Sequence, residues 1–164
     1  MNKSELIESK IPDQAGLERM LAYWRFREMK IVFTNGCFDL LHFGHIDYLM
    51  KASELGHILV IGLNSDESVR RLKGNSRPLV PQDARARLLA SLFFVDLVVL
   101  FEEDTPLNII QTIKPDFLVK GDDYQESEIV GGDFVKSYGG KIVRFPLVPG
   151  FSTTSIENKI KETL

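Results

Sequence analysis

The sequence predicts an α/β fold in which a doubly wound, parallel, five-stranded sheet forms a single domain. Short apolar runs alternate with amphipathic segments of helical period, and this alternation implies right-handed βαβ units. The runs are continuously apolar, which is typical of parallel strands covered on both faces. At 164 residues, the chain has the length of one ordinary domain.

The chain is expected to open with an irregular lead-in over residues 1–12, followed by one helix over about 14–28 that Asp13 caps. We therefore divide it into an N-terminal extension with one helix (1–29) and a main domain (30–164). The predicted helix carries one apolar face, made of Leu17, Met20, Leu21 and Trp24.

The remaining elements follow from periodicity and from helix start and stop signals. The strands are predicted at 31–34, 57–63, 96–101, 116–120 and 141–145. The helices are predicted at 43–55, 66–71, 83–93, 105–113, 133–138 and 154–163. Helix 43–55 is expected to turn Ile46, Leu49 and Met50 inward. Ligands of such sheets bind beyond the carboxyl ends of the strands, so the loops there are where the site is expected.

Composition excludes several classes of protein. The formal net charge of −3 argues against a nucleic-acid partner that is held by broad phosphate neutralisation. The single cysteine, Cys37, excludes an intrachain disulfide and indicates a reducing compartment. No apolar run has the length of a membrane span, and the N-terminus lacks the apolar stretch of a signal peptide. We expect a cytoplasmic protein with no membrane partner.

The chemistry is expected in the turn after the first strand, which continues into the His-x-Gly-His sequence of residues 42–45. His42 and His45 are three residues apart, so they share one face of the first helical turn. Free backbone N–H groups and the helix dipole favour a phosphate there. Gly36 and Gly44 remove side chains that would keep a bulky anion away. No GxGxxG or GxxxxGK[ST] motif is present, so the dinucleotide and P-loop fingerprints are missing.

The residues of this turn also allow other interpretations. The histidine spacing could arise by chance, or Asp39, His42 and His45 could hold a metal, although a fourth ligand is not evident. Cys37 could be a redox-active nucleophile. At the far end, Ser152, Thr153 and Thr154 could cap the last helix, hold the outer phosphates of a nucleotide, or do both.

Taken together, these segments resemble the cytidylyltransferase-like family of nucleotidyltransferases, whose fold is Rossmann-like. The family hallmarks G-x-F-D-x-x-H-x-G-H and S-T-T stand here as Gly36–His45 and Ser152–Thr154. Within the family, the chain most resembles the branch that joins ATP to heptose 1-phosphate. The matching stretches span about 31–160 and include Asn64-Ser65-Asp66, Arg71-Leu72-Lys73-Gly74, Ser76-Arg77-Pro78, Phe101–Pro106 and Val119-Lys120-Gly121.

The resemblance implies that a sugar 1-phosphate attacks the α-phosphorus of ATP and releases pyrophosphate, with Mg²⁺ held mainly by the phosphates and by no metal ligands of the protein. It implies catalytic roles for His42, His45 and Lys73. It implies nucleotide contacts for Thr34, Asn35, Gly36, Cys37, Phe38, Gly44, Lys120, Gly121, Asp123, Ser152, Thr153 and Thr154. It implies substrate contacts for Asp39, Asn64 and Arg77. Arg71, Lys73, Arg77 and Lys120 are expected to form a basic cluster at the polyphosphate, and Arg85 to lie on a helix within reach of it or exposed.

Two departures keep alternatives open. Residues 147–151 lack the arginine that the glycerol-3-phosphate cytidylyltransferases carry before S-T-T, which speaks against CTP. Conversely, Asp122-Asp123 resembles the CTP branch rather than the usual Gly-Asp of the heptose branch. A non-catalytic nucleotide-binding module is the alternative from another class, and a class I aminoacyl-tRNA synthetase is disfavoured by charge and length.

Expectations for partners follow from the same resemblance. The heptose branch is often fused to a kinase that makes the 1-phosphate. About 29 residues precede the first strand here, so we expect that kinase to be a separate protein. Apolar side chains on the first helix, Trp24 and Phe26, suggest a homodimer contact.

Overall fold

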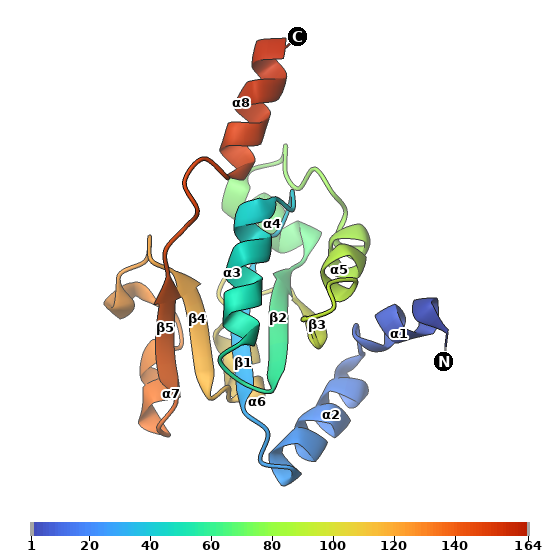
Figure 1. The fold of residues 1–164 in the computed structure, drawn as a ribbon, viewed down its shortest axis with the longest axis vertical. Helices are drawn as coiled ribbons and strands as arrows, with labels where there is room; N and C mark the ends of the chain where they lie inside the picture. The colour runs from blue at the N-terminus through green and yellow to red at the C-terminus, as the bar shows by residue number, and fades with distance from the viewer. Residues whose placement is uncertain (1, 164) are drawn as a thin grey trace.

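The computed structural model describes residues 2–163, which form a wholly parallel sheet with helices on both faces (Figure 1). The strand order in the sheet is β3-β2-β1-β4-β5. The chain therefore enters the sheet at the central strand β1, proceeds through β2 to the edge strand β3, and then crosses to β4 and β5 on the other side. This doubly wound order confirms the predicted fold class. The strands are β1 (Ile31–Gly36), β2 (Ile58–Asn64), β3 (Leu97–Phe101), β4 (Phe117–Gly121) and β5 (Lys141–Phe145).

Each face of the sheet carries its own apolar layer. Neighbouring strand residues point to opposite faces, and Val32 and Phe33 are both fully buried, on different sides. This is why the strands read as continuous apolar runs. One face is covered by α2 (Gln14–Phe26), α6 (Leu107–Ile113) and α7 (Gly132–Ser137), and the other by α3 (Phe43–Ser53) and α5 (Gln82–Ala90).

The N-terminal segment corrects one expectation. The irregular lead-in contains a second helix, α1 (Lys3–Ser9), so the extension has two helices rather than one. Asn2 and Glu5 form a capping box at its start, a signal that we overlooked. The Lys10 carbonyl then accepts the Val98 N–H, so this segment shields the outer edge of β3.

Two further differences concern helices near the carboxyl ends of the strands. Met50 was expected to face inward but is 41% exposed, whereas Ala52 is buried in its place. The short helix after β2 continues further than expected, as α4 (Asp66–Lys73), and brings Lys73 into its last turn. The last helix, α8 (Thr153–Thr163), rises away from the carboxyl ends of the strands (Figure 1). Among residues 2–163, no helix is both long and apolar enough to cross a membrane.

Candidate active site

A pocket of about 410 Å³ opens where β1 and β4 end, which is the predicted edge of the sheet. The walls come from the turn after β1, the first turn of α3, the ends of α4 and β4, and the segment before α8. The pocket brings together most of the residues that the sequence predicted: Asn35, Gly36, Cys37, Phe38, Asp39, His42, Gly44, His45, Lys73, Lys120, Gly121, Asp123, Ser152 and Thr153.

The two histidines form a stacked pair. Their ring centroids lie 3.8 Å apart with an interplanar angle of 21°, and Phe38 meets His45 edge-on at 5.2 Å. Burial, and then the neighbouring His42, lower the pKa of His45 to about 4, and burial also lowers the pKa of His42. Both imidazoles are therefore neutral at pH 7. Their Nδ1 atoms are buried and have no hydrogen-bond partner among the described residues.

Gly44 makes room for the protein itself. A Cβ at this position would lie 3.1 Å from the His42 Nδ1 and 3.3 Å from the Phe151 carbonyl oxygen. The space was expected to admit an anion, and the structure uses it for the His42 ring and for the segment that precedes α8. Gly44 thus lets α3 and that segment meet beside the histidines.

Two lysines, from the ends of α4 and β4, line the pocket. The Lys120 Nζ, at the end of β4, donates to the Asn35 side-chain oxygen at 2.5 Å and lies 5.8 Å from the Tyr124 ring centre. Burial lowers the pKa of Lys120 to about 8, a shift that the carboxylate of Asp123 partly opposes. Lys73 is exposed at the end of α4. A buried ammonium ion with one neutral oxygen as partner is a site for an anion.

Asp39 borders the pocket, but its oxygens are already engaged. They accept the Arg77 guanidinium at 2.7 Å and the backbone N–H groups of Leu79 and Val80 at 2.7 and 3.0 Å. Burial alone would raise the pKa of Asp39, yet the Val80 N–H, the Arg77 guanidinium and the Leu79 N–H together hold it below its ordinary value. Asp39 therefore anchors the 77–80 loop in the free protein. No group of three or more potential metal ligands is assembled within residues 2–163.

Arg77 and Asn64, both expected to contact substrate, do not line the pocket. Arg77 is held by Asp39 and by Glu157 of α8. The Asn64 amide donates to the Ser68 hydroxyl at 2.9 Å, inside the start of α4. Arg71 also turns away and pairs with Asp104, so the expected basic cluster reduces to Lys73 and Lys120 at this pocket.

Arg85 supports the turn after β1 from behind. Its side chain is fully buried and does not line the pocket, so it is neither exposed nor in reach of a ligand there. The guanidinium donates to the Cys37 and Asn64 carbonyls at 2.6 and 2.9 Å and pairs with Asp66. It thereby ties the ends of β1 and β2 together.

Tyr48 is a pocket residue that sequence reasoning missed. It lies three residues after His45 on α3, and that spacing could have revealed it. Its hydroxyl shares a 2.7 Å hydrogen bond with the Thr34 hydroxyl, so Thr34 lies behind Tyr48 and does not line the pocket. Leu147, Val148 and Phe151 also line the pocket, and no motif pointed to them.

The start of α8 combines the two roles that the sequence left open. The Ser152 hydroxyl accepts the Ser155 N–H at 3.0 Å and the Ser155 hydroxyl accepts the Ser152 N–H at 3.1 Å, which is reciprocal capping. Ser152 and Thr153 line the pocket as well, whereas Thr154 is exposed and does not.

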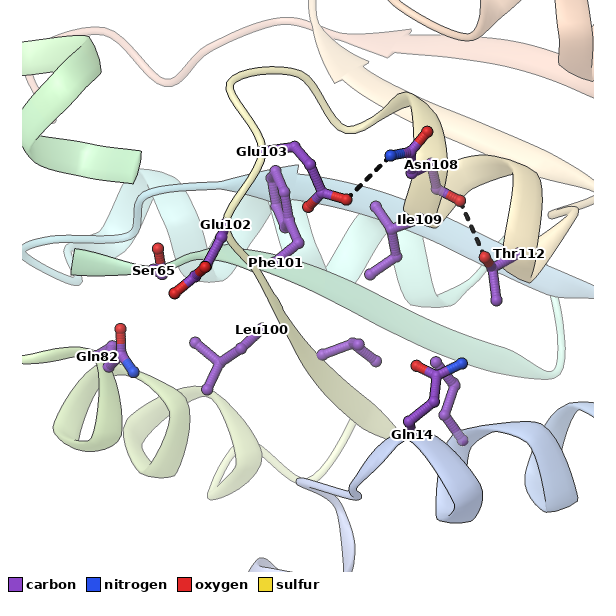
Figure 2. A pocket seen from close by; sticks show the side chains of 12 residues that line it. Gln14, Ser65, Gln82, Leu100, Phe101, Glu102, Glu103, Asn108, Ile109 and Thr112 are labelled. Atoms are coloured by element: carbon purple, nitrogen blue, oxygen red, sulfur yellow. Dashed lines mark hydrogen bonds between the residues drawn. The ribbon is translucent and has the colours of Figure 1, made fainter. Parts of the chain in front are cut away.

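A second cavity, of about 320 Å³, lies beside β3 between α2, α5 and α6 (Figure 2). Amide, hydroxyl and carboxylate groups surround an apolar floor, and the Asn108 amide donates to Glu103 at 3.1 Å. None of the predicted site residues and none of the histidines lines it. The residues that the sequence singled out therefore gather in the pocket at β1 and β4.

The fold and this pocket define a nucleotidyltransferase rather than a dinucleotide-binding or P-loop enzyme. A sequence model of the cytidylyltransferase-like family matches residues 33–159, and the chain belongs to that family.

The bifunctional protein HldE of Magnetococcus marinus is 54% identical over 151 residues, which are 92% of this chain and 31% of that protein. HldE of Helicobacter pylori is 55% identical over 147 residues, 90% of this chain and 31% of that one. The chain thus spans about a third of the length of these relatives.

Among solved structures, the lipopolysaccharide core biosynthesis protein of Thermoplasma volcanium superposes with a TM-score of 0.63 at 31% identity, over 73% of this chain and 98% of that one. Pantoate-beta-alanine ligase of Francisella tularensis, in complex with beta-gamma ATP and beta-alanine, superposes with a TM-score of 0.62 at 21% identity. The match covers 93% of this chain and 77% of that one. The second likeness supports the fold alone.

Proposed function

We propose that the chain transfers AMP from ATP to heptose 1-phosphate, releasing pyrophosphate and forming ADP-heptose for lipopolysaccharide core synthesis. The observation that carries the proposal is the stacked, neutral pair His42 and His45, which lines one pocket together with Lys73 and Lys120. A site of this kind binds and orients phosphate groups, and the proposed reaction takes its nucleophile from the substrate rather than from the protein. Burial raises the pKa of the Cys37 thiol, which disfavours its thiolate.

In the proposed reaction, a phosphate oxygen of the sugar 1-phosphate attacks the α-phosphorus in line. A new P–O bond forms there as the bond to the bridging oxygen of the β-phosphate breaks, and pyrophosphate leaves with that electron pair. His42 and His45 donate N–H groups to the phosphate oxygens on which charge grows. Lys120 and Lys73 hold the polyphosphate from two sides, so catalysis consists of positioning and charge stabilisation.

The pocket does not offer a cage for Mg²⁺. Asp39 is engaged by Arg77 and two N–H groups, which leaves Asp123 as the other carboxylate that lines the pocket. We infer that the ion arrives with the triphosphate of ATP, and no step of the proposed reaction is assigned to it.

The nucleotide and the acceptor follow from the relatives and from the residues near β4. The relatives named HldE are 50–56% identical, and a similar structure bears the name of a lipopolysaccharide core biosynthesis protein. Leu147, Val148 and Phe151 give the pocket an apolar wall in the segment where the CTP enzymes carry an arginine. The supply of the sugar 1-phosphate by a kinase, and a cytoplasmic location, remain predictions.

The test is a matrix of pyrophosphate-release assays. ATP and CTP are each offered with heptose 1-phosphate, glycerol 3-phosphate and 4′-phosphopantetheine. We expect ATP with heptose 1-phosphate to give the highest kcat/KM. Highest activity with CTP and glycerol 3-phosphate would establish the alternative substrate pair. ATP binding without pyrophosphate release from any pair would establish a non-catalytic module.

A further inference from the structure

We propose that Glu157 and Arg77 are positioning residues: their ion pair latches α8 to the body of the protein and so holds Ser152 and Thr153 in the wall of the nucleotide pocket. The role in nucleotide binding rests on the proposed function. The latch itself is a statement about the free protein and is testable apart from it.

The first step concerns how little else holds α8. None of its residues is buried, and the helix rises away from the sheet (Figure 1). Ile160 is 53% exposed, and every residue from 158 to 163 is exposed. A helix without a buried apolar face receives little stabilisation from packing and is marginal at this length on its own. Its place must therefore be set near its first turns.

The second step concerns where α8 does make contact. Glu157 pairs with Arg77, and its side chain is 25% exposed, whereas that of Arg77 is 17% exposed. Just before the helix, Phe151 meets Phe43 edge-on with ring centroids 5.2 Å apart. One contact is charged and the other aromatic, and both lie in or just before the first turns of α8.

The third step connects this ion pair to the pocket. Thr153 and Glu157 are four residues apart, so they lie on one face of the helix, one turn from each other. Thr153 lines the pocket while Glu157 reaches Arg77. Arg77 is in turn fixed by Asp39, whose side chain is 2% exposed and lies in the turn after β1. The ion pairs of Arg77 with Asp39 and with Glu157 thus connect the turn after β1, the 77–80 loop and α8.

The Glu157–Arg77 ion pair is partly shielded from water. Water weakens an exposed pair. The Glu157 Oε1, in contrast, is buried and has no hydrogen-bond partner among the described residues, so the neighbouring Arg77 charge is what compensates its burial. Arg77 is already oriented by Asp39, so pairing with Glu157 costs little additional side-chain entropy. This explains why Arg77 is absent from the pocket wall: it acts on the pocket through α8.

The test uses Glu157→Gln, which keeps the size of the side chain and removes its charge, with Glu162→Gln as the matched control on the exposed end of α8. In the full chain without nucleotide, we expect backbone hydrogen exchange over 150–158 to be at least fivefold faster in Glu157→Gln and unchanged in the control. With MgATP, we expect KM to rise about tenfold and kcat to change less than twofold, because the wall binds nucleotide but does not react.

A double variant distinguishes an effect of the Glu157–Arg77 ion pair from an effect of Glu157 alone. If the pair acts as a unit, adding Glu157→Gln to Arg77→Gln produces no further increase in exchange or in KM. Unchanged exchange in Glu157→Gln would overturn the latch, whatever the enzyme does. Faster exchange with an unchanged KM for MgATP would overturn the role of the latch in nucleotide binding. If the wild-type chain releases no pyrophosphate from any substrate pair, the proposed function fails while the exchange result still decides the latch.

Discussion

His45 is the residue whose proposed role is most sharply defined. It is neutral at pH 7, it stacks on His42, and it shares the pocket with Lys73 and Lys120. A preorganised donor of this kind stabilises the transition state more than the ground state. We expect His45→Ala to lower kcat about 100- to 1,000-fold, equivalent to about 3–4 kcal/mol, while the Kd for MgATP changes less than about fivefold.

Steady-state kinetics together with equilibrium ATP binding measures this split. The matched control is His57→Ala, because the third histidine accepts the Lys30 N–H at the opposite end of the sheet and should not affect kcat. Equal losses in turnover and in ATP affinity would show that His45 only binds.

Lys120 is a residue at which we expect ligand binding to be gained at a cost in stability. Its pKa of about 8 lies below the usual 10.5, so at neutral pH the folded state carries a charge that burial disfavours. Because the folded pKa is the lower one, this penalty is fully present below pH 8 and disappears as pH rises towards 10.5. We expect Lys120→Met to raise Tm at pH 7 and to raise the KM for MgATP about tenfold or more.

Thermal unfolding at pH 7 and pH 10 measures the first effect, and the gain in Tm should be smaller at pH 10. Lys141→Met, at the exposed start of β5, is the control. A lower Tm in Lys120→Met at pH 7 would mean that the Asn35 contact stabilises the fold more than burial of the charge destabilises it.

At the scale of elements, the 77–80 loop depends on Asp39. The carboxylate is nearly inaccessible and accepts one guanidinium and two backbone N–H groups. Breaking a buried ion pair by removing one partner costs about 3–5 kcal/mol. We expect Asp39→Asn to lower the free energy of unfolding by about 3 kcal/mol, as measured by urea denaturation at pH 7.

The sign of the pH effect follows from the lowered pKa of Asp39. The stabilisation is present at neutral pH and is lost as pH falls below the ordinary aspartate value, so the wild type and Asp39→Asn should converge in acid. Asp83→Asn, on the exposed face of α5, should change stability by less than about 0.5 kcal/mol. A stable Asp39→Asn protein with a raised KM for the sugar phosphate would restore the substrate contact that the sequence suggested.

Elements also show how far the sequence could predict this fold. Continuous apolar runs such as 58–63 predicted every strand, because burial on both faces leaves a signal within the run itself. The helix α1 was missed because its signal is one capping box with no buried face. Asp39 and Arg77 lie 38 residues apart in the chain, and nothing local indicates that they pair. Sequence reasoning therefore could not predict contacts between side chains of distant elements, such as the Asp39–Arg77 pair.

For the whole molecule, assembly remains open to experiment. The expected dimer surface combined Trp24 with Phe26, yet Trp24 is 8% exposed and packs in the core, while Phe26 is 85% exposed. If Phe26 forms the contact, light scattering should give a dimer for the wild type and a monomer for Phe26→Ser. A wild-type monomer at high concentration would remove the homodimer prediction.

The chemistry is also a property of the whole molecule, because the pocket needs the turn after β1, the ends of α4 and β4, and the start of α8 together. The central claim is that this arrangement joins AMP to a sugar 1-phosphate. Its most direct test is mass spectrometry of the product after the purified chain is incubated with MgATP and heptose 1-phosphate. We predict an ADP-sugar together with one pyrophosphate per product molecule, and almost none with His45→Ala. Bound ATP that stays intact, with no ADP-sugar formed, would contradict the account.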